Sequence, residues 1–258
     1  MPKFAANLSM MFTEHQFLDR FDAAAEAGFA AVEYLFPYDH APAAIAERLK
    51  RNDLTQALFN LPPGDFAAGE RGLAALSGRA EEFRASVDRA LDYAAATGVK
   101  RLHMMAGLAS SSDPKALVTY QGALELAARK LGEAGLDLVI EPINARNMPG
   151  YFLDDFGLAE KIIADSGMAN VKLQFDIYHR QIMHGDVTMA LRHFMPITGH
   201  VQIASVPSRN EPDGEELNYP FLFAELDRLG YEGYVGCEYN PRGRTTDGLG
   251  WFKPFARS

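Results

Sequence analysis

The sequence has a single cysteine, Cys237, among its 258 residues. A disulfide within the chain is therefore excluded, and so is a Cys-x-x-Cys metal or redox motif. The sequence also contains no run of 18 apolar residues, which argues against a transmembrane helix. Residues 1–7 lack the apolar stretch of a secretory signal peptide. These absences favour a cytoplasmic protein that does not act in a membrane.

Positive charge is also scarce. The chain has 25 lysines and arginines against 34 aspartates and glutamates, which gives a net charge of −9. This excess of negative charge is unfavourable for general binding to nucleic acid or to an anionic membrane. With 22 glycines and 14 prolines the chain is not of low complexity, and its 48% hydrophobic content is typical of a globular protein with a large core.

Short apolar runs alternate along the chain with longer segments of helical periodicity. The runs are typical of buried strands, and each intervening segment is long enough for a helix and two loops. This alternation indicates a parallel sheet with helical crossovers, and eight strands are the number that closes into a barrel. We therefore predict one (β/α)8 TIM-barrel domain over residues 1–258. The eight candidate strands are Phe4–Asn7, Ala31–Leu35, Gln56–Asn60, Arg101–Met105, Leu136–Glu141, Val171–Asp176, His200–Ile203 and Tyr234–Glu238.

A doubly wound open sheet is the main alternative fold. Such a sheet usually carries a glycine-rich phosphate turn after its first strand, but here the first strand is followed by residues 8–11, Leu-Ser-Met-Met, and neither a GxGxxG nor a Walker motif is present. Local signals also predict details of the barrel. Thr13 and Gln16 form a capping-box pattern that predicts a helix start, and Asp113 before Pro114 predicts another. Residues 61–78 are long and rich in glycine and proline, which predicts an active-site loop.

Polar side chains stand at or near the ends of four successive candidate strands. They are Glu141, Asp176, Gln202 and Glu238. In a TIM barrel the chemistry lies at the carboxyl ends of the strands. Any one of these residues alone is readily explained as a strand cap or a salt-bridge partner, but that explanation is weak for all four. Three carboxylates on one rim repel each other and raise each other's pKa values, and a bound cation relieves the conflict. Oxygen ligands suit a hard divalent ion, so we predict one Mg²⁺ or Mn²⁺.

Loop residues near these strand ends are candidates for substrate binding. His179 lies three residues beyond Asp176, where it either points back over the metal or faces solvent. Arg209 follows the seventh strand and either clamps an anionic substrate or is solvated. In the third loop, Glu70 either reaches the site or pairs with Arg71.

Two further polar residues lie inside candidate strands. Glu33 is in the second strand, and it either supports the site from inside the barrel or is a hydrogen-bonded structural residue. We favour the structural interpretation. His103 is in the fourth strand, and we interpret it as a core histidine whose hydrogen bonds are satisfied.

These strand ends resemble those of a known family. The resemblance is to the hydroxypyruvate isomerase family, a group of xylose-isomerase-like TIM barrels, and it extends over essentially the whole chain. Some segments resemble most the 2-oxo-tetronate isomerase branch, namely Met10–Glu14, Ala57–Asn60 and Gly248–Phe252. The motifs that carry the family resemblance are Ile140-Glu141-Pro142-Ile143-Asn144, Gln174-Phe175-Asp176-Ile177-Tyr178-His179, His200-Val201-Gln202-Ile203-Ala204 and Gly236-Cys237-Glu238-Tyr239.

The resemblance implies an activity and a set of site residues. It implies a metal held by Glu141, Asp176, Gln202 and Glu238, with Glu141 and Glu238 as proton donor and acceptor. The implied reaction is an aldose–ketose isomerisation of 2-oxo-tetronate or of hydroxypyruvate and tartronate semialdehyde, by proton transfer through an enediolate in carbohydrate metabolism. In the related sugar epimerases the counterpart of His179 touches the substrate, and a histidine usually replaces Gln202.

Other functions on the same barrel remain open at this point. A sugar 3-epimerase would use the same site. An abasic-site endonuclease needs more histidine ligands and a basic surface than a chain with seven histidines and a charge of −9 provides. A non-catalytic binder of sugar acids is disfavoured by the intact set of candidate ligands. We expect a small-molecule substrate and neither nucleic acid nor membrane as a partner, and a homo-oligomer is compatible with the sequence. The four-carbon acid is the substrate that we favour.

Overall fold

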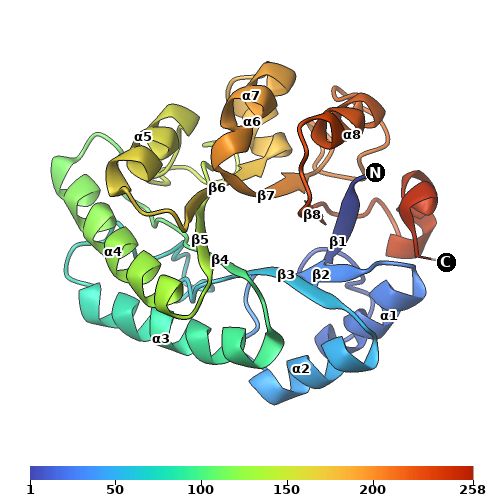
Figure 1. Ribbon diagram of the computed structural model, residues 1–258, viewed down its shortest axis with the longest axis horizontal. Coiled ribbons are helices and arrows are strands. Elements are labelled where there is room, and N and C mark those ends of the chain that lie inside the picture. Colours follow the sequence, from blue (N-terminus) through green and yellow to red (C-terminus); the bar gives the residue numbers. More distant parts are fainter. Residues whose placement is uncertain (258) are drawn as a thin grey trace.

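The parallel strands of this chain pair in sequence order, and β8 pairs with β1, so that the sheet closes into a barrel. The protein is seen here in a computed structural model that describes residues 1–257. Figure 1 shows the strands inside a ring of helices. The predicted TIM barrel is confirmed, and the open doubly wound sheet is excluded. The strands are β1 Lys3–Asn7, β2 Ala31–Glu33, β3 Thr55–Asn60, β4 Arg101–His103, β5 Asp137–Ile140, β6 Val171–Asp176, β7 Thr198–Ile203 and β8 Tyr234–Cys237.

The helices cover the outside of the barrel, and α6 and α7 both follow β6. Their apolar faces pack on the strands, as expected from burial of hydrophobic surface. No helix within residues 1–257 has the length and apolar character needed to span a bilayer. The α-helices are α1 Arg20–Glu26, α2 Pro42–Arg51, α3 Ala80–Thr97, α4 Pro114–Glu133, α5 Phe156–Ser166, α6 Ile177–Met183, α7 Val187–Phe194 and α8 Tyr219–Arg228, and the 3-10 helices are η1 Phe17–Asp19, η2 Met195–Ile197, η3 Thr245–Trp251 and η4 Lys253–Phe255.

The predicted helix start at Thr13 is wrong. Residues 13–16 form no helix, and α1 begins only at Arg20, after the short η1. The cause is a contact from the other end of the chain. The Thr245 hydroxyl accepts a hydrogen bond from the backbone N–H of Phe12 at 2.6 Å, and Glu14 bonds to Thr245 in turn. In contrast, Asp113 caps α4 as predicted, because its side chain accepts a hydrogen bond from the backbone N–H of Lys115.

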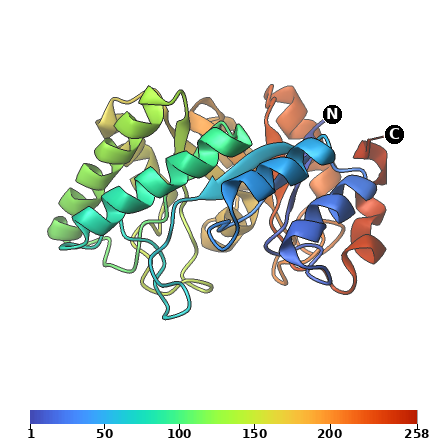
Figure 2. The same cartoon turned by 90° about the horizontal axis from the view of Figure 1, so that it is seen from below.

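The ends of the strands decide where the polar side chains lie. β5 ends at Ile140 and β8 at Cys237, so Glu141 and Glu238 are each the first residue beyond a strand. Asp176 is the last residue of β6, and it is in register with Gln202 of β7. Figure 2 shows the loops that connect strands to helices on one side of the barrel, and the teal loop between β3 and α3 extends furthest. The four polar side chains therefore lie together at the carboxyl ends of the strands, as the sequence predicts.

Candidate active site at the carboxyl ends of the strands

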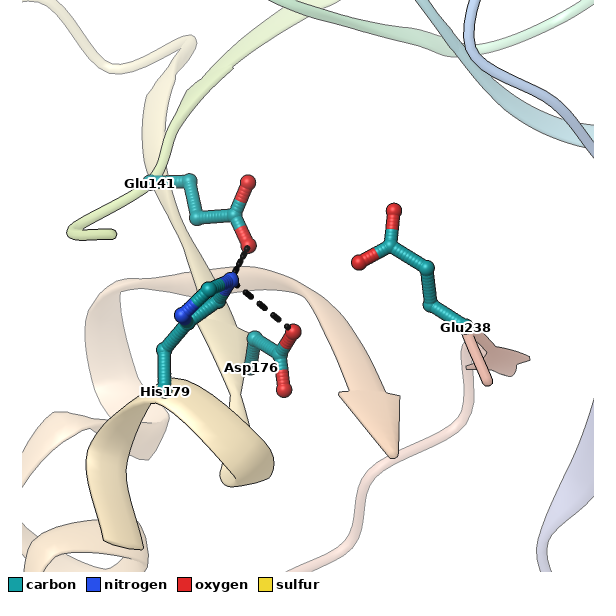
Figure 3. A group of neighbouring side chains, drawn as sticks. All are labelled: Glu141, Asp176, His179 and Glu238. Atoms are coloured by element: carbon teal, nitrogen blue, oxygen red, sulfur yellow. Dashed lines mark ion pairs between the residues drawn. The ribbon is translucent and has the colours of Figure 1, made fainter. Parts of the chain in front are cut away.

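Four side chains converge at this end of the barrel (Figure 3). Glu141, Asp176, His179 and Glu238 each offer a ligand atom within 4.8 Å of the others, and all four are buried. Asp176 also caps α6 by accepting a hydrogen bond from the backbone N–H of Tyr178 at 2.7 Å, which places His179 in the first turn of that helix. His179 Nε2 lies 3.8 Å from Glu141 Oε1 and 3.6 Å from Asp176 Oδ2. Glu238 faces this group from the opposite side.

The guanidinium of Arg209 lies against this acidic cluster. Arg209 Nη2 donates a hydrogen bond to Glu238 Oε2 at 2.5 Å and lies 3.9 Å from Asp176 Oδ2. The guanidinium carbon also lies 4.8 Å from the centre of the Tyr178 ring, an arrangement typical of a cation–π contact. Arg209 is thus fixed beside the carboxylates, and it is mostly buried there.

Burial makes the ionised form of the three carboxylates unfavourable. Burial raises the pKa of Glu141 well above its usual range, and the neighbouring charges of Glu238 and Asp176 raise it further. Burial also raises the pKa of Glu238 to about 8 and that of Asp176 to about 6, although Arg209 opposes both shifts. Glu141 Oε1 and Asp176 Oδ2 have no hydrogen-bond partner within residues 1–257. Buried, mutually repelling oxygens of this kind fit a divalent cation.

Gln202 is held beside this cluster by a hydrogen-bond network. Its Nε2 donates to Glu33 Oε1 at 2.8 Å, and its Oε1 accepts from Gln174 Nε2 at 2.6 Å. Glu33 also receives hydrogen bonds from Asn7 and His200. Since β2 and β7 are separated by β8 and β1, these bonds cross the interior of the barrel. Glu33 is therefore a hydrogen-bonded structural residue, and it also orients the Gln202 amide, whose oxygen keeps a second lone pair.

His103 departs from the prediction of a satisfied core histidine. Both of its ring nitrogens lack a hydrogen-bond partner in the part of the chain that the structure describes, and Nε2 lies 3.7 Å from Glu141 Oε2. Burial lowers the pKa of His103 to about 3, with a smaller contribution from the nearby His200. The ring lines the cavity above the carboxylates. The prediction was wrong because the ring faces the polar mouth of the barrel, where it meets no protein acceptor.

Glu70 is not brought to the carboxylate cluster. Its Oε1 accepts a hydrogen bond from Arg79 Nη1 at 2.6 Å, and its other oxygen accepts one from the backbone N–H of Asp65 at 2.6 Å. Arg71, the partner suggested by the sequence, instead stacks on the ring of Phe66 with 4.0 Å from guanidinium carbon to ring centre. Substrate contact by Glu70 therefore stays a prediction.

A small cavity opens onto the cluster. Its volume is about 230 Å³, which is below the usual size of a pocket for a drug-sized ligand and suits a molecule of a few carbon atoms. Phe36 and Phe66 meet at its wall, with ring centres 5.1 Å apart. The sequence analysis did not single out either ring. The polar lining is Asn60, His103, Glu141, Asn147, His179, Arg209 and Glu238, and the apolar lining is Met10, Leu35, Phe36, Phe66, Met105, Ile143 and Met148.

Comparison with known proteins places the chain in a family. Residues 21–255 match the model of the xylose isomerase-like TIM barrel family. The chain is 56% identical over 257 residues to the 2-oxo-tetronate isomerase of Cupriavidus necator, with 99% of each chain covered. It is 44% identical over 257 residues to the hydroxypyruvate isomerase of Escherichia coli, with 99% of this chain and 100% of the relative covered.

Solved structures show the same fold. A crystal structure described as an AP endonuclease of family 2 from Brucella melitensis superposes with a TM-score of 0.97 at 53% identity, covering 99% of this chain and 100% of the other. An L-ribulose 3-epimerase superposes with a TM-score of 0.76 at 20% identity, covering 100% and 88%, which shows the fold alone. The full-length similarity to named isomerases is decisive for the class of protein. The chain belongs to the xylose isomerase-like TIM barrel family, and it is an isomerase of the hydroxypyruvate isomerase type.

Proposed function

We propose that this protein is a metal-dependent isomerase of 2-oxo-tetronate, which it converts by moving a proton between adjacent carbons and shifting the carbonyl. The observation that carries the proposal is the placement of two buried glutamates, Glu141 and Glu238, at one small cavity beside Arg209. The names of the two relatives support the substrate class, since both are isomerases of small hydroxy-oxo acids.

The ligands of the metal in this proposal are Glu141, Asp176, Gln202 and Glu238. The unpartnered oxygens of Glu141 and Asp176 and the free lone pair of the Gln202 amide support this set. When bound, a divalent cation supplies Lewis-acid stabilisation of negative charge on the two neighbouring oxygens of the substrate.

The side chains of the protein carry out the proton transfer. One of Glu141 and Glu238 removes the proton from carbon and passes it to the former carbonyl oxygen. The other donates a proton to the neighbouring carbon and takes up the proton of the original hydroxyl in exchange, so that both glutamates end in their starting states. Burial raises the pKa values of both glutamates, which brings proton exchange closer to neutral pH. Arg209 provides a positive charge for the substrate carboxylate, and His179 lies where it can bond to a substrate oxygen. The apolar wall formed by Phe36 and Phe66 excludes water from the reacting carbons.

The proton-transfer role is tested by conservative substitution. Glu141→Gln and Glu238→Gln each keep an oxygen but remove the base, so turnover should fall at least about 100-fold. In the unmodified enzyme, deuterium from solvent should enter the product at the carbon that gains a proton. Glu125→Gln is the matched control, because Glu125 is exposed on α4, pairs with Arg129 and does not line the cavity. Near-normal turnover of Glu141→Gln or Glu238→Gln would exclude that residue from the proton transfer.

The substrate is tested by comparing kcat/KM for 2-oxo-tetronate and hydroxypyruvate on one Mg²⁺-loaded preparation. A site that hydrogen-bonds the additional hydroxyl discriminates against the acid that lacks it, because its polar groups then remain unpaired. The unpartnered ring of His103 is such a polar group at the cavity. We expect the higher value for the four-carbon acid. A higher value for hydroxypyruvate would reassign the substrate and leave the proton-transfer residues unchanged.

Abasic-site cleavage serves as the contrasting assay, since one solved relative is described as an AP endonuclease. Within residues 1–257 we find one group of acidic, histidine or cysteine side chains that could hold a metal, and it includes a single histidine. Together with the net charge of −9, this arrangement is unfavourable for a nuclease with several zinc ions. We expect no cleavage of abasic DNA by the preparation that isomerises the acid.

A further inference from the structure

The second ring nitrogen of His179 has an unusual environment. The backbone N–H of Asn144 points at His179 Nδ1 with a distance of 3.2 Å between the nitrogens. The side-chain Nδ2 of Asn144 also lies 2.6 Å from Nδ1. A backbone N–H can only donate, so Nδ1 must accept and carries no hydrogen.

The orientation of the Asn144 side chain is fixed independently. Its Oδ1 accepts a hydrogen bond from the backbone N–H of Asn147 at 3.0 Å, and this contact sets which end of the amide is oxygen. The amino group must therefore face His179. Two donors from one residue converge on Nδ1, and a proton there would leave buried N–H groups pointing at one another, which costs free energy.

The proton of the neutral ring is therefore on Nε2, the nitrogen that faces Glu141 and Asp176. A histidine that ligates a metal normally presents a bare nitrogen to the metal and donates its other N–H to an acceptor. Here the arrangement is reversed, because the outer nitrogen accepts. By distance alone His179 belongs with the three carboxylates as a fourth ligand, but its hydrogen bonds contradict that assignment.

We propose that Asn144 is a positioning residue that holds His179 in the Nε2–H tautomer, so that His179 donates a hydrogen bond to a substrate oxygen and does not ligate the metal. The substrate part of this statement rests on the proposed function, whereas the tautomer does not. Asn144 touches no part of the cavity itself, and its effect on the reaction passes through the imidazole.

The tautomer is measured by long-range proton–nitrogen NMR on protein with ¹⁵N-labelled histidine, first with chelator and then with Mg²⁺. The His179 resonances are assigned by their disappearance in His179→Gln. We expect the Nε2–H pattern in the chelated protein and no change to a metal-bound nitrogen with Mg²⁺. An Nδ1–H pattern, or a metal-bound Nε2, would overturn the proposal.

The role of Asn144 is tested with Asn144→Asp, which replaces the donor by an acceptor of the same shape. The new carboxylate competes with the remaining backbone N–H for Nδ1, so we expect a fraction of the His179 rings to carry a proton on Nδ1 and kcat/KM to fall about 10–100-fold. Asn218→Asp is the matched control, since it makes the same chemical change at the N-cap of α8, where aspartate caps equally well, and Asn218 does not line the cavity.

The outcomes separate this proposal from a structural role and from the proposed function. A purely structural role of Asn144 would lower stability and leave the tautomer unchanged, and that result overturns the proposal. If Asn144→Asp does not fold, the measurement on the unmodified protein still decides the tautomer. An inactive protein with the Nε2–H pattern would contradict the proposed function and leave the tautomer assignment intact.

Discussion

Replacement of Gly236 by alanine tests the network beneath the candidate metal site. Gly236 lies in β8, in register with Gln202 of β7. An added Cβ would lie 2.2 Å from Glu33 Oε2 and 2.5 Å from its carboxyl carbon, far inside contact distance. The Glu33 carboxylate is enclosed by its own hydrogen bonds, so it cannot move without breaking some of them.

The magnitude follows from those bonds. Glu33 accepts hydrogen bonds from Asn7 at 3.0 Å, His200 at 2.7 Å and Gln202 at 2.8 Å, and all the partners are buried. Loss of one such acceptor costs about 1–3 kcal/mol, and overpacking costs about the same. We therefore expect the free energy of unfolding to fall by about 2–6 kcal/mol, which lowers Tm by roughly 4–24 °C. Because Glu33 orients Gln202, affinity for Mg²⁺ should fall about 10–100-fold.

Calorimetric unfolding of the chelated protein and titration with Mg²⁺ measure these two effects. Gly122→Ala is the control, since its Cβ would meet open space in α4 and the change favours the helix by up to about 1 kcal/mol. Repeating Gly236→Ala in a Glu33→Ala background isolates the clash. An equal loss of stability in both backgrounds, or no loss in the unmodified one, would refute the reasoning.

Three further predictions concern the site. Burial raises the pKa of Glu238 to about 8 and that of Asp176 to about 6, so above about pH 4 the chelated folded protein binds more protons than the unfolded chain. The Tm of the chelated protein should therefore fall as the pH rises toward 8, and Mg²⁺ should reduce this dependence. A Tm of the chelated protein that does not change with pH would contradict the prediction. Arg209→Lys should lower kcat/KM about 10–100-fold, from loss of one charged hydrogen bond, and an unchanged value would remove Arg209 from substrate binding. Phe66→Ala should raise KM, whereas the control Phe221→Ala, at an exposed residue outside the cavity, should leave KM unchanged, and Tm should stay within a few degrees in both variants. Equal KM values in the two variants would argue against Phe66 as part of the cavity wall.

The barrel could be predicted from the sequence because its signals are local. Apolar runs with helical segments between them gave the correct order and number of strands, and Glu141 and Glu238 follow their strands directly in the chain. The predicted strand ends were less accurate, since β2 and β4 are each two residues shorter than expected. Convergence of the strand-end residues then follows from closure of the barrel.

Other features could not be predicted because they depend on residues distant in the chain. The turn at Phe12 is set by Thr245, and no local pattern near Thr13 reports that contact. Glu70 forms an ion pair with Arg79, and the loop conformation that brings these two side chains together is not apparent from the sequence. The tautomer of His179 depends on the hydrogen-bond donors of Asn144. The sequence shows Asn144 as the last residue of a family motif, but it does not show that these donors meet the ring of His179. Each of these outcomes requires knowledge of which side chains meet in space.

The cavity is lined by two parts of the chain with different chemistry. The apolar wall near the start of the chain comes from the loops after β1, β2 and β3, with Met10, Phe36 and Phe66. The acidic groups come from β5, β6 and β8. Part of the apolar lining thus comes from a stretch of the gene that encodes none of the four clustered side chains, whereas Met105, Ile143 and Met148 come from later segments. Exchange of the loops after β1, β2 and β3 between relatives would change part of the apolar lining and leave Glu141, Asp176, His179 and Glu238 in place, a modular route by which the cavity of this barrel can be reshaped.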